Sequence, residues 1–245
     1  MPKSAPARTQ AERADQARAR ILDAAVREFS ENGLAGARTE HIAEAAGVNK
    51  ALLYYYFQNK EALYTAALES VAEQVVAHGM AALHSPATAG ERVVRFALHH
   101  FDRIHSQRPF QTLMQHEMMR LHRGEESALA FIVDRVFRPT MGPVEQLIAE
   151  GQRAGELVRT DPWQMMYAAL GANVFYFLSA PVMEHLTGKK LFERAALRAR
   201  RKAAVEHLGQ TIFVDRRHGA RVAARVLADI PMPRSGEFKP QEKRA

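Results

Sequence analysis

The chain has 245 residues, of which 47% are hydrophobic and 25% charged, a balance that excludes wholesale disorder and allows a buried core. It contains no cysteine, which excludes disulfides, a cysteine nucleophile and thiolate metal sites, and accords with a reducing compartment. The first 20 residues contain arginines but no apolar run, and no stretch reaches the roughly 20 uninterrupted apolar residues of a membrane helix. We therefore expect a soluble, cytoplasmic, globular protein without a membrane partner.

The formal net charge of +7 is unevenly distributed along the chain. Residues 190–245 carry 14 basic and 6 acidic side chains, whereas the rest of the chain is nearly neutral. This excess fits either a second nucleic-acid surface or a solvated helix face followed by a basic tail. The basic side chains concerned include Arg198, Arg200, Arg201, Lys202, Arg216, Arg217, Arg221 and Arg225.

The residue pattern predicts an all-α protein without internal repeats. Strand-like alternation is absent, and good helix formers fill the stretches between glycines and prolines. After a disordered basic arm (1–14), three short helices are expected at about 16–32, 39–46 and 50–57. Gly33 and Gly47 would provide the turns between them, and Asn59 would cap a fourth helix running to about Met80.

The rest of the chain predicts a larger helical region. Asp161 and Pro162 are a strong start signal for a helix, which Pro181 should stop at about Ser179. Pro139 and Pro143 predict a kink or two helices between residues 125 and 153. The remaining expected elements are helices at about 91–106, 108–122 and 192–213, a short helical turn after Gly219, and a disordered end over residues 229–245.

Three short helices joined by glycine turns are typical of a helix-turn-helix unit. In such a unit the second helix of the pair enters the major groove of DNA. Gly47 permits a positive φ at the turn, and Ile42, Ala43 and Ala46 suit a close helix crossing. Leu53 and Phe57, four residues apart, are the expected core pair of the third helix. The consecutive residues Tyr54, Tyr55 and Tyr56 splay around that helix, so at least one of them must be exposed.

The block from Gly47 to Leu63, GVNKALLYYYFQNKEAL, closely resembles the signature of the tetracycline-repressor (TetR) family of bacterial transcriptional regulators. The upstream residues Ile21 to Ala25, Phe29, Gly33 and Thr39 fit the same pattern. The resemblance implies a DNA-binding domain at 15–63 and a regulatory and dimerisation domain at 64–228. It also implies a repressor that binds a palindromic operator in double-stranded DNA as a homodimer and is released by a small, largely apolar or aromatic effector, without enzymatic activity.

The family pattern carries DNA contacts over to particular residues of this chain. Ala51 and Leu52 depart from the pattern, because family members often have glycine and a small or hydroxylated residue there. Two apolar residues reduce hydrogen-bonding readout, although Leu52 can touch thymine methyl groups. We also expect Arg8, Arg13, Arg18 and Arg20 to add phosphate contacts from the arm. The expected DNA-contacting residues are Thr39, Asn49, Lys50, Ala51, Leu52, Tyr54, Tyr55, Tyr56 and Lys60.

The resemblance implies an effector cavity and a two-fold dimer made by the helices at 162–179 and 192–213. Eight of the 10 methionines lie between Met80 and Met183, and adaptable thioethers suit a pocket for apolar ligands. An ordinary hydrophobic core is the alternative explanation for these side chains. The candidate lining residues are Phe110, Met114, Met118, Phe137, Met141, Trp163, Met166, Tyr167 and Asn173. No cofactor is expected.

Two other functions remain open at this point. A helical metal-dependent hydrolase could use His99, His100, His105, His116 and His122, but no two of these have the four-residue spacing of two ligands on one helix face. A nucleoid-type DNA binder could use the basic C-terminal helix. The serines lack a strand-turn-helix setting and no glycine-rich phosphate loop occurs, which argues against catalysis. We therefore expect no catalytic residue and no metal site.

Overall fold

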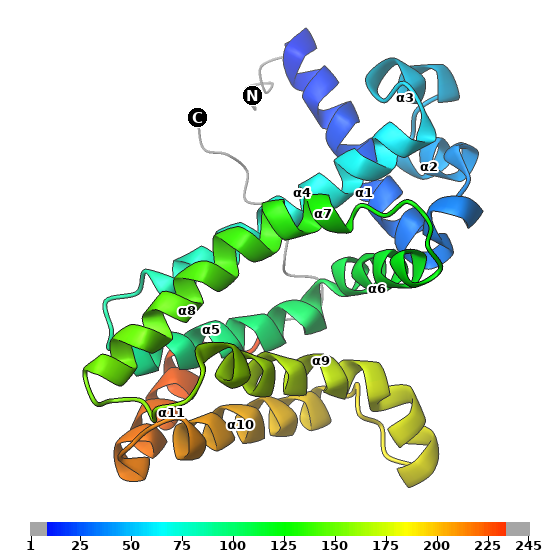
Figure 1. The fold of residues 1–245 in the computed structure, drawn as a ribbon. Helices are drawn as coiled ribbons and strands as arrows, with labels where there is room; N and C mark the ends of the chain where they lie inside the picture. Colours follow the sequence, from blue (N-terminus) through cyan, green and yellow to red (C-terminus); the bar gives the residue numbers. More distant parts are fainter. Residues whose placement is uncertain (1–8, 234–245) are drawn as a thin grey trace, which may run out of the picture. The chain divides into compact units, whose positions relative to one another are not determined.

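The computed structural model describes residues 9–233, apart from the side chains of His78 and Arg108. Within that range the elements are helices, with one isolated β-bridge between Leu157 and Phe213, so the predicted all-α class is confirmed (Figure 1). The helices are α1 (Gln10–Gly36), α2 (Thr39–Ala46), α3 (Lys50–Tyr56), α4 (Lys60–Leu83), α5 (Ala89–Ser106), α6 (Arg108–His122), α7 (Leu129–Ile132), the π-helix η1 (Val133–Phe137), α8 (Arg138–Arg153), α9 (Pro162–Thr187), α10 (Arg194–Thr211) and α11 (Arg216–Asp229).

Backbone contacts divide the chain into two compact units. Unit 1 comprises Met1–Glu73 and Pro109–Ile132, and unit 2 comprises Gln74–Arg108 and Val133–Ala245. Unit 1 therefore contains α1 to α3, the first part of α4, α6 and α7. Unit 2 contains the end of α4, α5 and everything from η1 onward.

Helix α1 begins earlier than the sequence predicted. Thr9 and Glu12 form a capping box, in which each side chain accepts a hydrogen bond from the backbone N–H of the other. Residues 9–14 of the expected disordered arm are consequently ordered, and that part of the prediction is wrong. Residues 1–8 of the arm lie outside the described residues.

The core of unit 1 follows the predicted apolar pattern. Gly33 interrupts α1 with a φ of 64°, and Gly47 ends α2 in the left-handed conformation with a φ of 65°. Phe29 of α1 meets Tyr64 of α4 edge to face, with ring centroids 4.9 Å apart. The predicted inward-facing residues are buried, namely Ile21, Leu22, Ala25, Phe29, Ile42, Ala43, Ala46, Leu53 and Phe57.

Unit 2 is built around α5, which packs against α8, α9, α10 and α11. One face of α5 is apolar, and the other carries charged residues that are paired internally. Asp102 and Arg201 of α10 form a buried bidentate ion pair with N–O distances of 2.8 and 2.9 Å. Buried apolar side chains from these helices form one hydrophobic core, which includes Val94, Leu98, Ile148, Val205, Phe213 and Val222.

Two helices of unit 2 differ from their predictions. Helix α9 continues through Pro181 to Thr187, and α11 is a full 14-residue helix rather than a short turn. Gly219 lies within α11. The helix crosses α10 at this point so closely that a Cβ on Gly219 would lie 1.9 Å from the carbonyl oxygen of Gly209, so only glycine fits there. The stretch between residues 125 and 153, which contains Pro139 and Pro143, divides into the helical segments α7, η1 and α8, in line with the expected kink or pair of helices.

Much of the C-terminal basic excess has a structural role. Besides Arg201, Arg225 pairs with Glu91 of α5 at 2.5 Å, and Arg200 donates to the carbonyl of Ala172 at 3.1 Å. These three cations make contacts within unit 2, whereas Arg198, Lys202, Arg216, Arg217 and Arg221 are exposed. Residues 234–245 of the expected disordered end lie outside the described residues.

Candidate nucleic-acid interface

Helices α2 and α3 form the compact pair that the sequence predicted. The N–H of Gly47 donates to the carbonyl of Glu44 at 3.0 Å, and the N–H of Val48 donates to that of Ala43 at 3.0 Å. Asn49 then caps α3, because its Oδ1 accepts a hydrogen bond from the N–H of Leu52 at 2.7 Å. Two residues, Val48 and Asn49, thus separate the glycine cap of α2 from the first residue of α3, as in a helix-turn-helix pair.

The buried and exposed sides of α3 are sharply different. Leu53 is fully buried and Phe57 is 5% exposed, which confirms the predicted core pair. On the opposite side, Ala51 is exposed and Tyr55 is 80% exposed, and Lys50 is exposed at the first residue of the helix. Helix α3 therefore presents a cation, a methyl group and a phenol to solvent from a rigidly packed backbone.

The other two tyrosines are partly buried and make specific contacts. The hydroxyl of Tyr54 lies 3.1 Å from Oγ1 of Thr39, and the ring of Tyr56 lies edge to face with that of Tyr55 at 5.4 Å. Thr39 itself is only 6% exposed. Its hydroxyl therefore joins α2 to α3 here, a role that the sequence did not predict.

An ion pair connects the exposed surfaces of the two helices. Lys50 Nζ lies 2.5 Å from Oε1 of Glu40, and both side chains are more than half exposed. This hydrogen bond is the main reason why the pKa of Lys50 is raised and that of Glu40 is lowered. Lys50 also lies 5.7 Å from the centre of the Tyr54 ring. Sequence reasoning did not identify Glu40 as a residue of this surface. The signal that could have found it is that α3 contains no acidic residue to pair with Lys50.

The remaining candidate contacts have mixed roles. Lys60 donates to the carbonyl of Ala35 at 3.2 Å, so it also ties the start of α4 to the end of α1. Leu52 is half-buried. Arg20 donates to the carbonyl of Ala46 at 3.0 Å, and Arg18 lies 5.5 Å from the centre of the Phe57 ring. The expected arm cations Arg18 and Arg20 thus brace the core of unit 1, whereas Arg13 is exposed on α1 and Arg8 lies outside the described residues.

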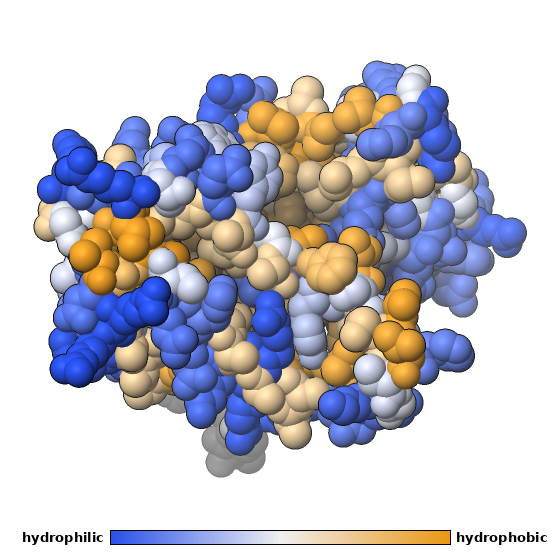
Figure 2. All heavy atoms as spheres, turned by 60° about the horizontal axis from the view of Figure 1, so that its bottom comes forward, coloured by the Kyte–Doolittle hydropathy of each residue, from blue (hydrophilic) through white to orange (hydrophobic). Residues whose placement is uncertain are grey.

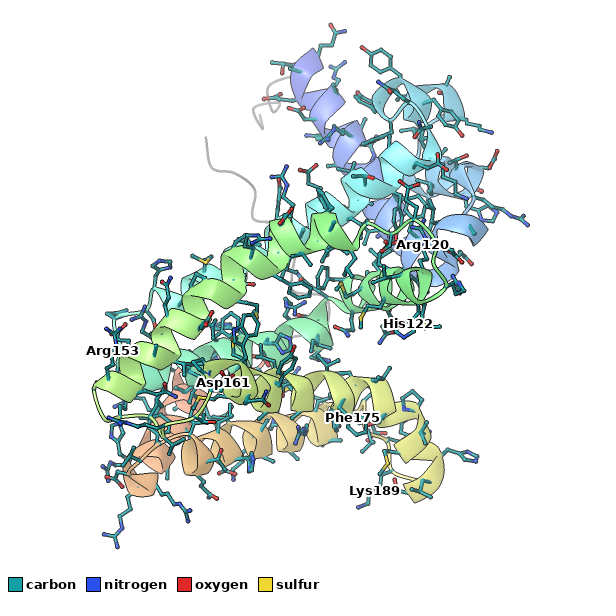
Figure 3. The ribbon with its side chains drawn as sticks, in the orientation of Figure 1. Arg120, His122, Arg153, Asp161, Phe175 and Lys189 are labelled. Carbon is teal, nitrogen blue, oxygen red and sulfur yellow. The ribbon has the colours of Figure 1, made fainter. Side chains whose placement is uncertain are left out.

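A second feature of unit 1 is a buried carboxylate. The side chain of Glu117 on α6 is fully buried and accepts hydrogen bonds from the hydroxyl of Tyr64 at 2.5 Å and from Arg120 at 2.9 Å (Arg120 is labelled in Figure 3). Ser127 donates at 3.0 Å, and the N–H of Ala128 donates as well. Burial raises the pKa of Glu117, but these hydrogen bonds lower it by more, so the net shift is downward.

Comparison with known proteins agrees with this geometry. The family described as "Bacterial regulatory proteins, tetR family" matches residues 21–67, and "Tetracyclin repressor-like, C-terminal domain" matches residues 86–208. The chain is 31% identical over 176 residues to the HTH-type transcriptional regulator RutR of Escherichia coli strain K12, which covers 70% of this chain and 78% of RutR. The chain belongs to the TetR family of transcriptional regulators.

Other relatives support the same assignment. The HTH-type transcriptional repressor NicS of Pseudomonas putida KT2440 is 32% identical over 173 residues, or 69% of this chain and 79% of NicS. Among solved structures, FadR from Bacillus subtilis in complex with stearoyl-CoA has a TM-score of 0.59 at 22% identity, covering 78% of this chain and 97% of FadR. Together with the family matches, this makes the chain a DNA-binding transcriptional regulator, not an enzyme.

The metal hypothesis gains no support from the structure. Among residues 9–233, no three His, Asp or Glu side chains are grouped so that they could hold a metal ion. The predicted candidates His100 and His105 lie on α5, whereas His116 and His122 lie on α6 in the other unit. His116 is used in packing, since its ring lies 3.6 Å from the position of a Cβ on Gly33.

The predicted effector-lining residues are divided between the two units. Met118, Trp163 and Tyr167 are 52%, 43% and 69% exposed. Phe110 and Met114 are buried in unit 1. In unit 2, Met166 and Asn173 are buried, and Phe137 and Met141 are half-buried.

Proposed function

We propose that this TetR-family regulator reads a palindromic operator with the solvent-facing side of α3. The observation that carries the proposal is the exposed surface of α3, where Ala51 and Tyr55 stand opposite the buried Leu53 and Lys50 is exposed at the first residue of the helix. Lys50 is placed for a phosphate or a guanine edge, Ala51 for a thymine methyl group and Tyr55 for a backbone phosphate. The other candidate residues would make supporting contacts around these three, namely Thr39, Asn49, Leu52, Tyr54, Tyr56 and Lys60.

Lys50 must exchange its partner when DNA binds. In the free protein its ammonium group is hydrogen-bonded to Glu40. A phosphate would have to displace that carboxylate, and the displaced charge of Glu40 would then repel the DNA backbone. Glu40 therefore weakens sequence-independent binding, and base contacts made by α3 must compensate for it at the operator.

A homodimer is part of the proposal, and α9 provides its surface. By length and composition α9 is the one helix within residues 9–233 that could cross a membrane, although core helices of soluble proteins pass the same test. One face of α9 packs on α5 and α10, while the other is apolar and exposed. Large apolar side chains lie along this face at intervals of three, four or eight residues: Trp163, Tyr167, Phe175, Leu178, Val182 and Leu186.

A second copy of the chain is the occupant that we assign to this α9 face. A helix that is apolar all round is normally buried all round. A hydrophobic surface of this extent on a soluble regulator marks a protein interface. Figure 2 brings α9 and α10 to the front and shows hydrophobic side chains exposed among hydrophilic ones. Two copies joined there would present two α3 helices to the two half-sites of a palindrome.

Repression and effector release complete the proposal. The named repressor NicS favours repression for this chain, and the complex of FadR with stearoyl-CoA, a ligand with a long apolar chain, supports an effector that is apolar in part. An effector that binds one arrangement of the dimer more tightly would shift the dimer away from the DNA-binding arrangement. We expect the protein to act in the cytoplasm, where the operator lies.

Footprinting tests the proposed function directly. The full chain is incubated with DNA from upstream of its own gene, at moderate salt, and cleaved with DNase. We expect protection of a palindrome whose half-sites are about one helical turn apart. Uniform or absent protection would contradict operator binding, and protection of a single half-site would contradict the dimer.

A further inference from the structure

The solvent side of α3 forms a ridge made by Ala51 and Tyr55. These residues are four apart, so their side chains lie one above the other on the same side of the helix. Ala51 is exposed and Tyr55 is 80% exposed, whereas Leu53 on the opposite side is fully buried. A groove that receives α3 by its solvent side therefore meets a methyl group and a phenol first.

The first turn of α3 is the part that would come closest to the base edges. In a helix-turn-helix unit, the N-terminal residues of the reading helix contact the bases. In this chain they are Lys50, Ala51 and Leu52, of which Ala51 is exposed and Leu52 is half-buried. Apart from the ammonium group of Lys50, the helical residues of this turn offer only apolar side chains to DNA.

The polar side chains around this turn already form hydrogen bonds within the protein. Lys50 Nζ donates to Glu40 at 2.5 Å, and Asn49 Oδ1 accepts a backbone N–H of the first turn at 2.7 Å. The hydroxyls of Thr39 and Tyr54 lie 3.1 Å apart. A base that takes one of these groups as its partner replaces an existing hydrogen bond, so the exchange contributes little net free energy to discrimination between bases.

We propose that α3 discriminates between bases through thymine methyl groups, which Ala51 contacts and beside which Leu52 adds apolar surface. Thymine presents a C5 methyl group in the major groove, and an alanine side chain is a suitable apolar partner for it. A cytosine at the same place would set its N4 amino group against apolar side chains and leave that donor without a partner. The assignment rests on the proposed function, because it names the base chemistry that the reading helix selects.

Lys50 and Tyr55 have a different role in this assignment. Their ammonium and phenol groups contact phosphates, which are the same in every sequence, so they contribute affinity rather than discrimination. Ala51 contributes discrimination, because its methyl group has a partner only where a thymine lies beneath it. The two kinds of contact are therefore separable by experiment: removal of the thymine methyl group should weaken binding to the operator and leave binding to random-sequence duplex unchanged.

Uracil substitution in the footprinted operator tests the assignment with the wild-type chain. Uracil differs from thymine only in lacking the methyl group, and it replaces one thymine of each half-site at a time. Fluorescence anisotropy gives the affinity of each duplex. At one position or more we expect a loss of roughly fourfold per half-site, or about fifteenfold for both, which is the value of burying one methyl group. At that position 5-methylcytosine should bind more tightly than cytosine.

Ala51→Gly provides the protein side of a double-mutant cycle. Without the alanine methyl group, the thymine and uracil duplexes should bind with affinities within about twofold of each other. Ala19→Gly, at an exposed position of α1, makes the same chemical change elsewhere in unit 1 and should keep the full preference for thymine. Circular dichroism verifies folding. If Ala51→Gly fails to fold, the uracil and 5-methylcytosine duplexes decide the question with the wild-type chain.

Each remaining outcome overturns the assignment. It is wrong if uracil at every thymine position leaves operator affinity unchanged, or if Ala51→Gly keeps the preference for thymine. A loss of affinity confined to 7-deazaguanine, which lacks the N7 acceptor, would assign the discrimination to a hydrogen bond from Lys50 instead. A protected operator that is insensitive to uracil contradicts this assignment alone. The absence of any protected palindrome contradicts the proposed function, and this assignment with it.

Discussion

The helix pairs α2–α3 and α9–α10 are specified in different ways. The first pair consists of helices of eight and seven residues, which a left-handed glycine and an asparagine cap define locally. The second consists of helices of 26 and 18 residues, and tertiary contacts with α5 determine how far they extend and what they bury. Local signals thus define the DNA-reading pair, whereas packing defines the pair in unit 2. Substitutions on the exposed surface of α3 should accordingly change the affinity for DNA. Substitutions of the buried Arg201 on α10, or of its partner Asp102, should change the stability of the fold.

The largest effect is expected at the buried ion pair of unit 2. Asp102→Ala leaves the guanidinium of Arg201 buried without its carboxylate, which should lower the free energy of unfolding by about 3–5 kcal/mol. Urea denaturation measures the change. The double variant Asp102→Leu/Arg201→Met is the control and should recover most of the loss, because an apolar pair of similar volume replaces both charges. A loss of less than about 1 kcal/mol in the single variant would show that packing does not depend on this pair.

The next largest effect is expected on the apolar face of α9. Phe175 (labelled in Figure 3) and Val182 are 68% and 69% exposed on this face. The double variant Phe175→Glu/Val182→Glu should raise the dissociation constant of the dimer by about a hundredfold or more, because burying unpaired charges costs several kcal/mol. Sedimentation velocity measures the change.

Val214 provides the matched control for that experiment. It is 62% exposed and lies between α10 and α11, outside α9. Val214→Glu should leave the dimer intact. Equal behaviour of the two variants, or a wild-type chain that is monomeric at micromolar concentration, would contradict the dimer surface that we assign.

A smaller effect is expected at the buried carboxylate of unit 1. Glu117→Gln removes the charge that four hydrogen bonds stabilise, and should lower the free energy of unfolding at neutral pH by about 1.5–3 kcal/mol. The folded-state pKa of Glu117 lies below its ordinary value of 4.5, so its contribution is present above 4.5 and is lost as the pH falls through the lower, folded-state pKa.

Denaturation at several pH values tests this sign. The difference in stability between the wild-type chain and Glu117→Gln should shrink as the pH is lowered below 4.5. A difference that grows on acidification would mean that the carboxylate is protonated in the folded state.

The smallest effect is expected from Glu40 on α2. Glu40→Gln frees Lys50 and removes a negative charge from the reading surface, so binding to random-sequence duplex should tighten. The salt dependence should steepen by about one phosphate contact. Fluorescence anisotropy over a salt series measures both, with Glu31→Gln, exposed on α1, as the control. Unchanged random-sequence affinity would show that the ion pair does not compete with DNA.

Features that depend on neighbouring residues were predictable from the sequence. The glycine turns, the Asn59 and Asp161 caps and the apolar faces of α1 and α2 all follow from short-range rules, and each is present. The block from Gly47 to Leu63 resembles the TetR signature closely enough for the order of residues alone to indicate the family.

Features that depend on tertiary contacts were not predictable. Pro181 lies within α9, although by local rules it should have ended the helix. Gly219 looked like a helix start but serves the close crossing of α10 and α11. Trp163 and Tyr167, which the sequence suggested as effector-lining residues, are exposed on α9. Residue type alone does not reveal which side of a long helix faces the interior.

The double variant Lys50→Ala/Tyr55→Ala tests the central claim most directly. Both side chains are exposed, so stability should not change, whereas affinity for the footprinted operator should fall at least about tenfold, as each base or phosphate contact is worth about 1–3 kcal/mol. Anisotropy on the protected duplex measures the affinity, with Lys189→Ala, in the exposed turn after α9, as the control (Figure 3). Full operator affinity in the folded double variant would contradict the account, because the outer side of α3 would then not read DNA.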